Sequence, residues 1–168
     1  GKGILSSHLH SEGAYAEELA IITPGVGKKW VTELIKENNP EDISYFPHMN
    51  GQFVFKNAVV RFSEVIVEGL KHNNLTEKEI DLFIPHQANL RIIEVVAKRI
   101  GVPMEKVLVN IQRYGNTSAA CMPLVLWDFE SQLKKGDNII FTAFGAGFVN
   151  GASYYKWAYD GKSVAVKK

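Results

Sequence analysis

From residue 50 onward, short apolar runs alternate with longer amphipathic segments, and this alternation restricts the fold more than any other feature of the sequence. The apolar runs are 81–85, 106–110, 138–143 and 151–157, and most of them are continuous rather than alternating with polar residues. Continuous apolar strands are typical of a sheet that is covered on both faces. Strands separated by helices are typical of layered α/β domains. The sequence therefore predicts an α/β domain with helices on both faces of its sheet.

Helices are expected wherever apolar side chains recur every three to four residues. The clearest such set is Phe55, Val59, Phe62, Ile66 and Leu70, which predicts a long helix ending near residue 73. Two further helices are expected at about 87–100 and 117–133. The first of them should end at Gly101, because glycine commonly follows the last helical turn. Residues 3–10 should be extended, whereas 23–48 is irregular, with a short helix expected at about 30–37.

Composition narrows the class of protein. With 168 residues, 46% of them hydrophobic and 22% charged, the chain is long enough for one domain with a real core, here assigned to 1–160 with a polar tail at 161–168. A net charge of +1 gives no support to nucleic-acid binding. No apolar run reaches the roughly 20 residues of a membrane span, and residues 1–5 do not resemble a secretory signal. A cytoplasmic location is therefore expected.

Cys121 is the single cysteine, so an intrachain disulfide and a cysteine-based zinc cluster are excluded. Inside an expected helix and without an activating base nearby in sequence, it is interpreted as a small core residue rather than a nucleophile. His8 and His10 would share one strand face, but no nearby residues complete a metal site. The chain also begins without methionine, which suggests a piece of a longer protein.

Three junctions between expected elements carry the candidate chemistry: 84–89, 113–120 and 143–148. In α/β sheets, sites collect where strand ends meet helix starts. His86 should lie at a helix start, where the helix dipole disfavours its protonated form. A neutral imidazole and the amide of Asn116 could together donate hydrogen bonds to one developing oxyanion. The alternative is that both residues only cap helices.

Two other features have a simple structural interpretation beside a functional one. The run Gly145-Ala146-Gly147 permits close approach by a ligand, but a tight turn between two strands is the favoured interpretation. Arg91, Lys98 and Arg99 form a basic group on the second expected helix. Such a group usually covers a solvated face, although it could also receive an acidic partner.

The three junctions together closely resemble β-ketoacyl-acyl-carrier-protein synthase III, an initiating condensing enzyme of the thiolase-like superfamily. The resemblance rests on the segments PHQANLRI (85–92), RYGNTSAA (113–120) and FGAGF (144–148). Residues 3–13 and 49–55 also resemble that family, so that the likeness spans most of the chain, with 23–47 its weakest part. After Phe148 the family commonly has Thr-Trp-Gly, whereas this chain has Val149-Asn150-Gly151.

The resemblance implies a thiolase-like layered domain, with a mixed sheet, that forms one half of the two-domain synthase fold. Only the C-terminal half is represented, and the family's catalytic cysteine lies in the other half. By motif, His86 and Asn116 match the family's catalytic histidine and asparagine, and Cys121 matches no catalytic position. Matches to positions that line the substrate or coenzyme A tunnel are Met49, Gly51, Phe55, Asn89, Phe144, Gly145 and Ala146. Docking of the carrier protein is implied for Arg91, with Lys98 and Arg99 on the same helix.

The implied activity is decarboxylative condensation of an acyl-CoA primer with malonyl-acyl-carrier protein. The expected partners are acyl carrier protein, acyl-CoA, the N-terminal half of the same synthase and a second copy in a homodimer. No metal or redox cofactor is implied. The alternative is a binding module of the same fold that holds acyl-CoA or a carrier protein without condensing anything.

Overall fold

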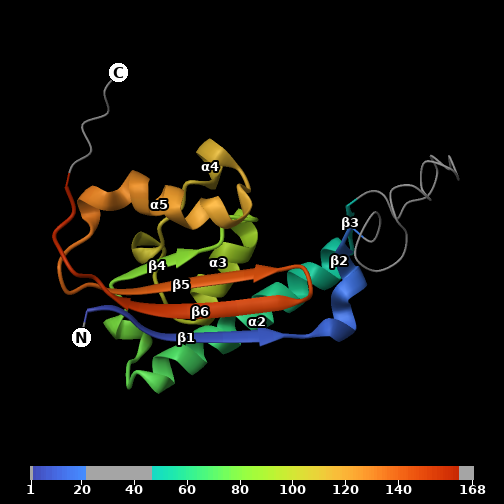
Figure 1. The fold of residues 1–168 in the computed structure, drawn as a ribbon, viewed down its shortest axis with the longest axis horizontal. Coiled ribbons are helices and arrows are strands. Elements are labelled where there is room, and N and C mark those ends of the chain that lie inside the picture. The colour runs from blue at the N-terminus through green and yellow to red at the C-terminus, as the bar shows by residue number, and fades with distance from the viewer. Residues whose placement is uncertain (1, 22–46, 163–168) are drawn as a thin grey trace, which may run out of the picture.

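The computed structural model describes residues 2–21 and 47–162, in which one four-stranded sheet carries the helices (Figure 1). The strands are β1 (Gly3–Ser11), β2 (Leu19–Ala20), β3 (His48–Met49), β4 (Leu82–Pro85), β5 (Asn138–Gly145) and β6 (Val149–Lys156). The α-helices are α2 (Gly51–His72), α3 (Leu90–Arg99), α4 (Ile111–Tyr114) and α5 (Cys121–Phe129). Short 3-10 helices lie at Gly13–Glu18, Glu77–Glu79, Met104–Lys106, Ser118–Ala120 and Glu130–Gln132.

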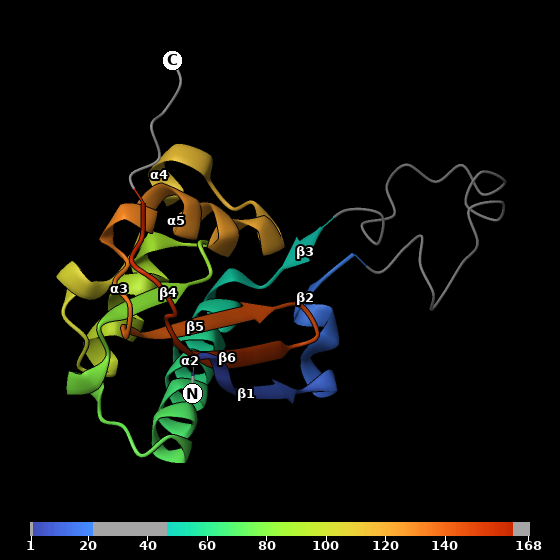
Figure 2. The same ribbon diagram turned by 60° about the vertical axis from the view of Figure 1, so that its left-hand side comes forward.

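The main sheet has the order β1-β6-β5-β4 and is mixed. β4 runs parallel to β5, whereas β6 is antiparallel to both β5 and β1. Strands β5 and β6 form a hairpin, and β1 pairs with β6 although the two are far apart in sequence. The strands β2 and β3 make a separate two-stranded ladder beside the N-terminal end of α2 (Figure 2). The expected mixed sheet is confirmed.

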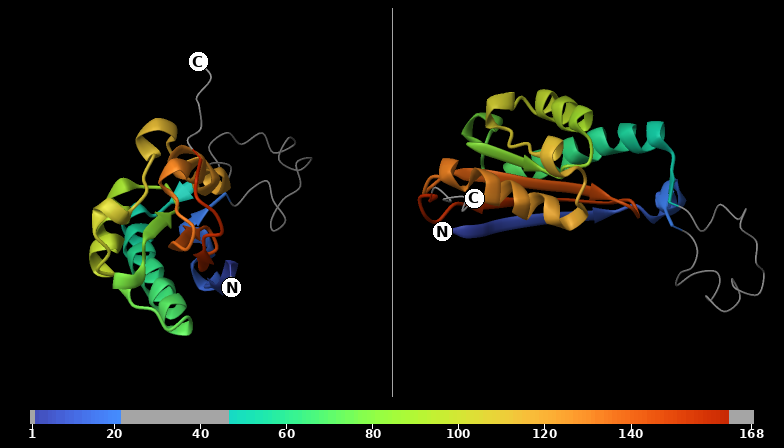
Figure 3. Two further views of the ribbon diagram at one scale, coloured as in Figure 1. Left: turned by 90° about the vertical axis from the view of Figure 1, so that its left-hand side faces the viewer. Right: turned by 90° about the horizontal axis from the view of Figure 1, so that it is seen from above.

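Helices cover both faces of the sheet, as expected, and two separate cores result. On one face, α2 and α3 pack against Phe83, Ile140 and Tyr154. On the other face, α5 packs against Ile84 and Ile139, the sequence neighbours of that first set. Successive residues of a strand point to opposite faces, which explains why β4 and β5 are apolar throughout. A view along the sheet shows α2 and α3 on one side and α5 on the other (Figure 3).

The long amphipathic helix is confirmed as α2, 22 residues from Gly51 to His72. The side chain of Asn50 accepts a hydrogen bond from the Phe53 amide and caps its start. In the last turns of α2, Glu68 contacts His8 Nδ1 at 3.1 Å and His10 Nε2 at 2.5 Å, both on β1. The two histidines do share one strand face, and that face is fastened to α2.

Two expected elements differ clearly from those observed, and the start of a third is shifted. The prediction of a strand at 106–110 is wrong: Met104–Lys106 is a 3-10 turn, and Val107 contributes only an isolated bridge to Phe83. The expected helix at 117–133 is reduced to α5, with a 3-10 turn at each end. Pro123 lies in the first turn of α5, where its missing N–H costs no helical hydrogen bond.

The expected helix at 87–100 begins later, at Leu90, because the Asn89 side chain accepts a hydrogen bond from the Arg91 amide and caps it. Its end is as expected, with Gly101 at φ +74° just beyond α3. The short helix expected at 30–37, and most of the tail expected at 161–168, lie outside the described residues. Across 2–21 and 47–162, no helix combines the length and apolar character needed to cross a membrane.

Candidate functional site

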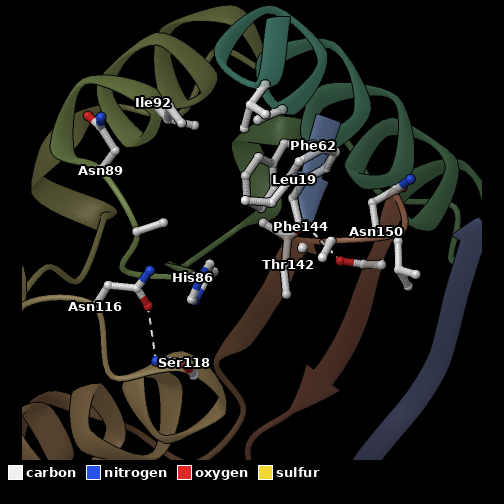
Figure 4. Close-up of a pocket in the computed structure, with 18 of the residues that line it drawn as sticks. Leu19, Phe62, His86, Asn89, Ile92, Asn116, Ser118, Thr142, Phe144 and Asn150 are labelled. Atoms are coloured by element: carbon white, nitrogen blue, oxygen red, sulfur yellow. Dashed lines mark hydrogen bonds between the residues drawn. The ribbon is translucent and has the colours of Figure 1, made fainter. Parts of the chain in front are cut away.

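One cavity of about 880 Å³ opens where β4 meets α3 and where the β5–β6 hairpin approaches the N-terminal end of α2. Figure 4 shows side chains from these elements converging on it. Every residue expected to line a substrate tunnel contributes to its wall, namely Met49, Gly51, Phe55, Asn89, Phe144, Gly145 and Ala146. His86 and Asn116 line the same cavity. The structure therefore brings together nine residues from four separate stretches of sequence.

His86 follows directly after β4, and its position is set by the sheet. Its backbone N–H donates to the Thr142 carbonyl at 2.8 Å, which continues the ladder between β4 and β5 by one residue. The ring is half-buried, and its Nδ1 lies 2.9 Å from the Sγ of Cys121. Among the described residues, no hydrogen bond reaches its Nε2. The ring thus has one nitrogen held by the protein and one left for a ligand.

Burial lowers the pKa of His86 below its ordinary value of 6.5. The direction agrees with the prediction from sequence, but the expected cause is wrong. α3 begins only at Leu90, four residues later, so His86 is not in the first turn of a helix and the dipole is not what lowers its pKa. His86 is accordingly neutral near pH 7.

Asn116 reaches the cavity because Gly115 turns the chain after α4. Gly115 has φ +65°, a conformation that favours glycine. The Asn116 Oδ1 accepts a hydrogen bond from the Ser118 amide at 3.0 Å. Its amide nitrogen points away from Ser118 towards the side of the cavity occupied by His86 (Figure 4). The capping interpretation therefore describes only the oxygen; in the part of the chain that the structure describes, no hydrogen bond to the nitrogen is formed.

Two neutral donors thus face one largely apolar cavity. The imidazole Nε2 of His86 and the amide of Asn116 can both donate to a carbonyl oxygen without titrating near neutral pH. Phe55, Ile92 and Phe144 supply apolar wall on the side of α2 and α3. Donors in a site of low polarity stabilise developing negative charge more strongly than the same donors do in water. The arrangement is suited to holding an enolate or another oxyanion.

Two residues of this site were missed by sequence reasoning. Cys121 is buried, as expected, but its thiol contacts the His86 ring rather than only the core. Gln87 is fully buried, and its side chain donates to the carbonyls of Pro85 and Leu108 and accepts from the Asn110 amide. The available signal for Gln87 was its place directly after a buried apolar strand, at a junction already expected to carry a site. Nothing in the sequence indicated that Cys121 and His86 touch.

The run Gly145-Ala146-Gly147 forms the tight turn between β5 and β6 that was expected, and it also borders the cavity. Gly147 has φ +133°, and a Cβ there would lie 2.7 Å from the Val149 side chain, so the turn requires glycine. Gly145 and Ala146, immediately before it, line the cavity. The turn therefore shapes the wall of the cavity without being a phosphate-binding loop at a helix start.

The basic group on α3 is exposed but is not gathered at one point. Arg91 lies in the first turn, between the cavity-lining residues Asn89 and Ile92. Lys98 and Arg99 lie in the last turn, about 10 Å along the helix axis at 1.5 Å per residue. No group of three or more His, Cys, Asp or Glu side chains within 2–21 and 47–162 is placed to hold a metal ion.

Comparison with known proteins finds relatives that are synthases of one type. The relative in Porphyromonas gingivalis, a beta-ketoacyl-[acyl-carrier-protein] synthase III, is 46% identical over 162 residues, which cover 96% of this chain and 47% of that protein. Synthase III 2 of Bacteroides thetaiotaomicron is 60% identical over 118 residues, 70% of this chain and 35% of that protein. The chain therefore spans about half the length, or less, of these relatives.

Solved structures agree on the fold. The 3-oxoacyl-[acyl-carrier-protein] synthase III of Aquifex aeolicus superposes with a TM-score of 0.77 at 36% identity, over 93% of this chain and 45% of that one. The enzyme from Pseudomonas aeruginosa gives 0.79 at 30% identity, over 95% and 45%. The expected thiolase-like α/β architecture is confirmed. A family model described as "3-Oxoacyl-[acyl-carrier-protein (ACP)] synthase III C terminal" matches residues 70–157, a stretch that contains His86, Cys121, Asn116 and the β5–β6 hairpin, and the chain belongs to this family.

Proposed function

We propose that this chain is the C-terminal catalytic half of a β-ketoacyl-acyl-carrier-protein synthase III, in which His86 and Asn116 bind the thioester oxygen of a malonyl group during decarboxylation. The observation that carries the proposal is that the Nε2 of His86 and the amide nitrogen of Asn116 face a single apolar cavity without a hydrogen-bond partner among the described residues. Family membership supports the reaction class, because the relatives named above are synthases of this type.

In the proposed reaction, an acyl-CoA first transfers its acyl group to a cysteine of the N-terminal half, and coenzyme A leaves. Malonyl thioester on the carrier protein then enters the cavity. The bond between its methylene carbon and its carboxylate breaks, carbon dioxide departs, and the electron pair moves towards the thioester oxygen. His86 and Asn116 donate to that oxygen and stabilise the enolate. Each such donor is worth roughly 2.7–4 kcal/mol of the barrier.

The enolate carbon then attacks the acyl thioester, the cysteine thiolate leaves, and a β-ketoacyl product remains on the carrier protein. Cys121 does not serve as that nucleophile in this proposal, because its thiol is buried and engaged with His86 and Gln87 rather than lining the cavity. The match to about half of the P. gingivalis relative supports a nucleophile supplied from elsewhere. The residues proposed here need no metal or redox cofactor.

The apolar walls fit an acyl chain, and exposed Arg91 beside the cavity fits an acidic carrier protein. In this proposal Arg91 makes the principal contact with the carrier protein, and Lys98 and Arg99 extend the basic surface along α3. The assignment follows from charge complementarity, which speeds association and selects partners. A homodimer of the completed synthase is part of the same proposal.

The decisive measurement is release of carbon dioxide from malonyl-acyl-carrier protein. It compares the chain alone with a hybrid in which this chain replaces the 162 matched residues of the P. gingivalis relative. We expect activity in the hybrid, and a loss of about 10²–10³-fold in His86→Ala and in Asn116→Ala. His72→Ala is the matched control, because His72 is exposed and does not line the cavity.

Two results would overturn the proposal. One is a folded hybrid without activity on either the malonyl group or the acyl primer, which would favour the non-condensing binding module. The other is activity that survives removal of both donors, since the enolate would then be stabilised by other groups. Acyl-CoA binding measured by calorimetry distinguishes an inactive binding module from a protein that does not recognise these ligands.

A further inference from the structure

The thiol of Cys121 connects the catalytic ring to the backbone next to it. Cys121 is the first residue of α5 and is 1% exposed. Its Sγ lies 2.9 Å from His86 Nδ1 and 3.3 Å from the backbone nitrogen of Gln87. In the described part of the chain, these are the two hydrogen-bonding neighbours of the sulfur. The question is which of these three groups supplies each proton.

Only one placement of the protons gives the Gln87 N–H, the Cys121 thiol and His86 Nδ1 a hydrogen-bond partner each. The Gln87 N–H can only donate, so the sulfur accepts from it. The thiol has a single hydrogen, and the neighbour that remains for it is His86 Nδ1. If the thiol donates to Nδ1, that nitrogen carries no proton, and a neutral His86 must carry its proton on Nε2.

The reverse arrangement leaves two groups without partners. If Nδ1–H donated to the sulfur, the sulfur would accept two hydrogen bonds, and its own hydrogen would be buried without an acceptor. In addition, Nε2 would face the cavity as a lone pair and could not donate to an oxyanion. We propose that Cys121 is a positioning residue that holds His86 in the Nε2–H tautomer by donating its S–H hydrogen to Nδ1.

A buried network keeps the backbone of Gln87 in place for this role. The Gln87 side chain donates to the Pro85 carbonyl at 2.7 Å and accepts from the Asn110 amide at 3.1 Å. The Asn110 side chain in turn donates to Asp128 of α5 at 2.9 Å. α5 therefore supports the segment around His86 at two points, through the thiol at its first residue and through Asp128 near its end.

The tautomer itself is independent of any reaction, but its consequence for catalysis rests on the proposed function. Nε2 is the ring nitrogen that carries the proposed hydrogen bond to the enolate oxygen. A partner on the far side of a catalytic imidazole fixes both its tautomer and its orientation. Replacing Cys121 should thus change turnover more than substrate binding.

The test reads the tautomer directly, in the 168-residue chain with ¹⁵N-labelled histidine rings. Long-range ¹H–¹⁵N spectra distinguish Nε2–H, Nδ1–H and imidazolium, and His86→Gln assigns the resonance. We expect Nε2–H in the wild type at pH 7 and in Cys121→Ser, which keeps a donor of one hydrogen. Cys121→Ala should give a mixture of tautomers. Val125→Ala is the matched control, because Val125 is fully buried on α5 one turn after Cys121 and packs in the core with Ile84 and Ile139.

Kinetics in the hybrid protein give a second measurement. Cys121→Ala should lower kcat for decarboxylation about tenfold with KM nearly unchanged, and Cys121→Ser should restore kcat. Val125→Ala should alter neither the tautomer nor this split between kcat and KM. A wild-type ring protonated on Nδ1, or charged at pH 7, overturns the inference, and this result needs no variant to fold. An inactive wild-type hybrid with the Nε2–H tautomer instead contradicts the proposed function alone.

Discussion

The Oδ1 of Asn116 accepts the backbone N–H of Ser118 at 3.0 Å, so that one end of the amide stabilises the turn before α5 and the other end is free to donate. The structural role of the Asn116 oxygen can therefore be separated by mutation from the proposed donor role of its nitrogen. A side chain of the same shape that keeps the acceptor but lacks the donor should preserve the fold and remove the function.

Asn116→Asp is that substitution. The carboxylate can still accept from Ser118, and we expect the free energy of unfolding to change by no more than about 0.5 kcal/mol. Decarboxylation in the hybrid should fall by about 10²–10³-fold, because the donor is lost and a negative charge faces the enolate. Urea unfolding and carbon dioxide release measure the two effects. Equal losses of stability and activity would contradict the separation.

The lowered pKa of His86 predicts a pH dependence of stability. In the window between its folded pKa and 6.5, the unfolded chain binds a proton at this position and the folded chain does not. The contribution of His86 to stability is therefore lost as pH falls from about 6.5 through that window, and it levels off below the folded pKa. His86→Gln removes this contribution. The difference in unfolding free energy between wild type and variant, measured in urea at pH 7.5 and pH 5.5, should shift against the wild type at the lower pH.

Gln87 should be among the most costly residues to replace in this region. In Gln87→Ala, the carbonyl of Leu108 and the amide of Asn110 lose their side-chain partner inside the core. Each buried group left unsatisfied costs about 1–3 kcal/mol, so we expect a loss near 3 kcal/mol in total. Gln112→Ala, at an exposed position, is the control and should change stability little. A small effect at Gln87 would show that water replaces its hydrogen bonds.

The β5–β6 turn should tolerate no side chain at Gly147. Gly147→Ala forces a left-handed φ of +133° on an L-residue and brings its Cβ to 2.7 Å from the Val149 side chain. Strain of this kind costs about 1–3 kcal/mol. Gly13→Ala meets no atom within 4 Å and should cost much less. Thermal unfolding of the two variants tests the contrast, and similar melting temperatures would contradict it.

Arg91 should affect recognition of the carrier protein rather than the chemical step. Reversing its charge in Arg91→Glu should raise KM for malonyl-acyl-carrier protein about tenfold, equivalent to about 1.4 kcal/mol, with little change in kcat. Lys71→Glu, an equal charge change at the end of α2 away from the cavity, is the control. The effect at Arg91 should shrink in high salt. A fall in kcat at unchanged KM would place Arg91 in the chemical step instead.

Much of the fold could be predicted because strong local patterns set it. The recurrence of Phe55, Phe62 and Leu70 required a helix, and α2 has nearly the expected bounds. The run at 106–110 is also apolar at its centre but forms no strand. It bonds to β4 only at Phe83, and the Leu108 carbonyl and the Asn110 amide bond to the Gln87 side chain instead. An apolar run in the sequence indicates that the segment is buried. Whether it becomes a strand depends on which backbone groups lie beside it in the folded protein, which the sequence does not show.

The candidate site, too, could be predicted only in part from the sequence. His86 and Asn116 could be named because each belongs to a recognisable segment next to an expected junction. Their shared cavity required the structure, and so did the contact between His86 and Cys121, which are 35 residues apart. The expected dipole effect on His86 was wrong because the Asn89 cap moves the start of α3 beyond it.

The pairing of β1 with β6 has a consequence for how the chain is made. Gly3 lies opposite Lys156, so β1 has no partner until β6, the last strand along the described chain, has been synthesised. Contacts of such long sequence separation form late and slow folding. During synthesis, Leu5 and Leu9 are carried on an unpaired strand that is open to wrong partners. The sheet is therefore completed only after every one of its other strands has been synthesised.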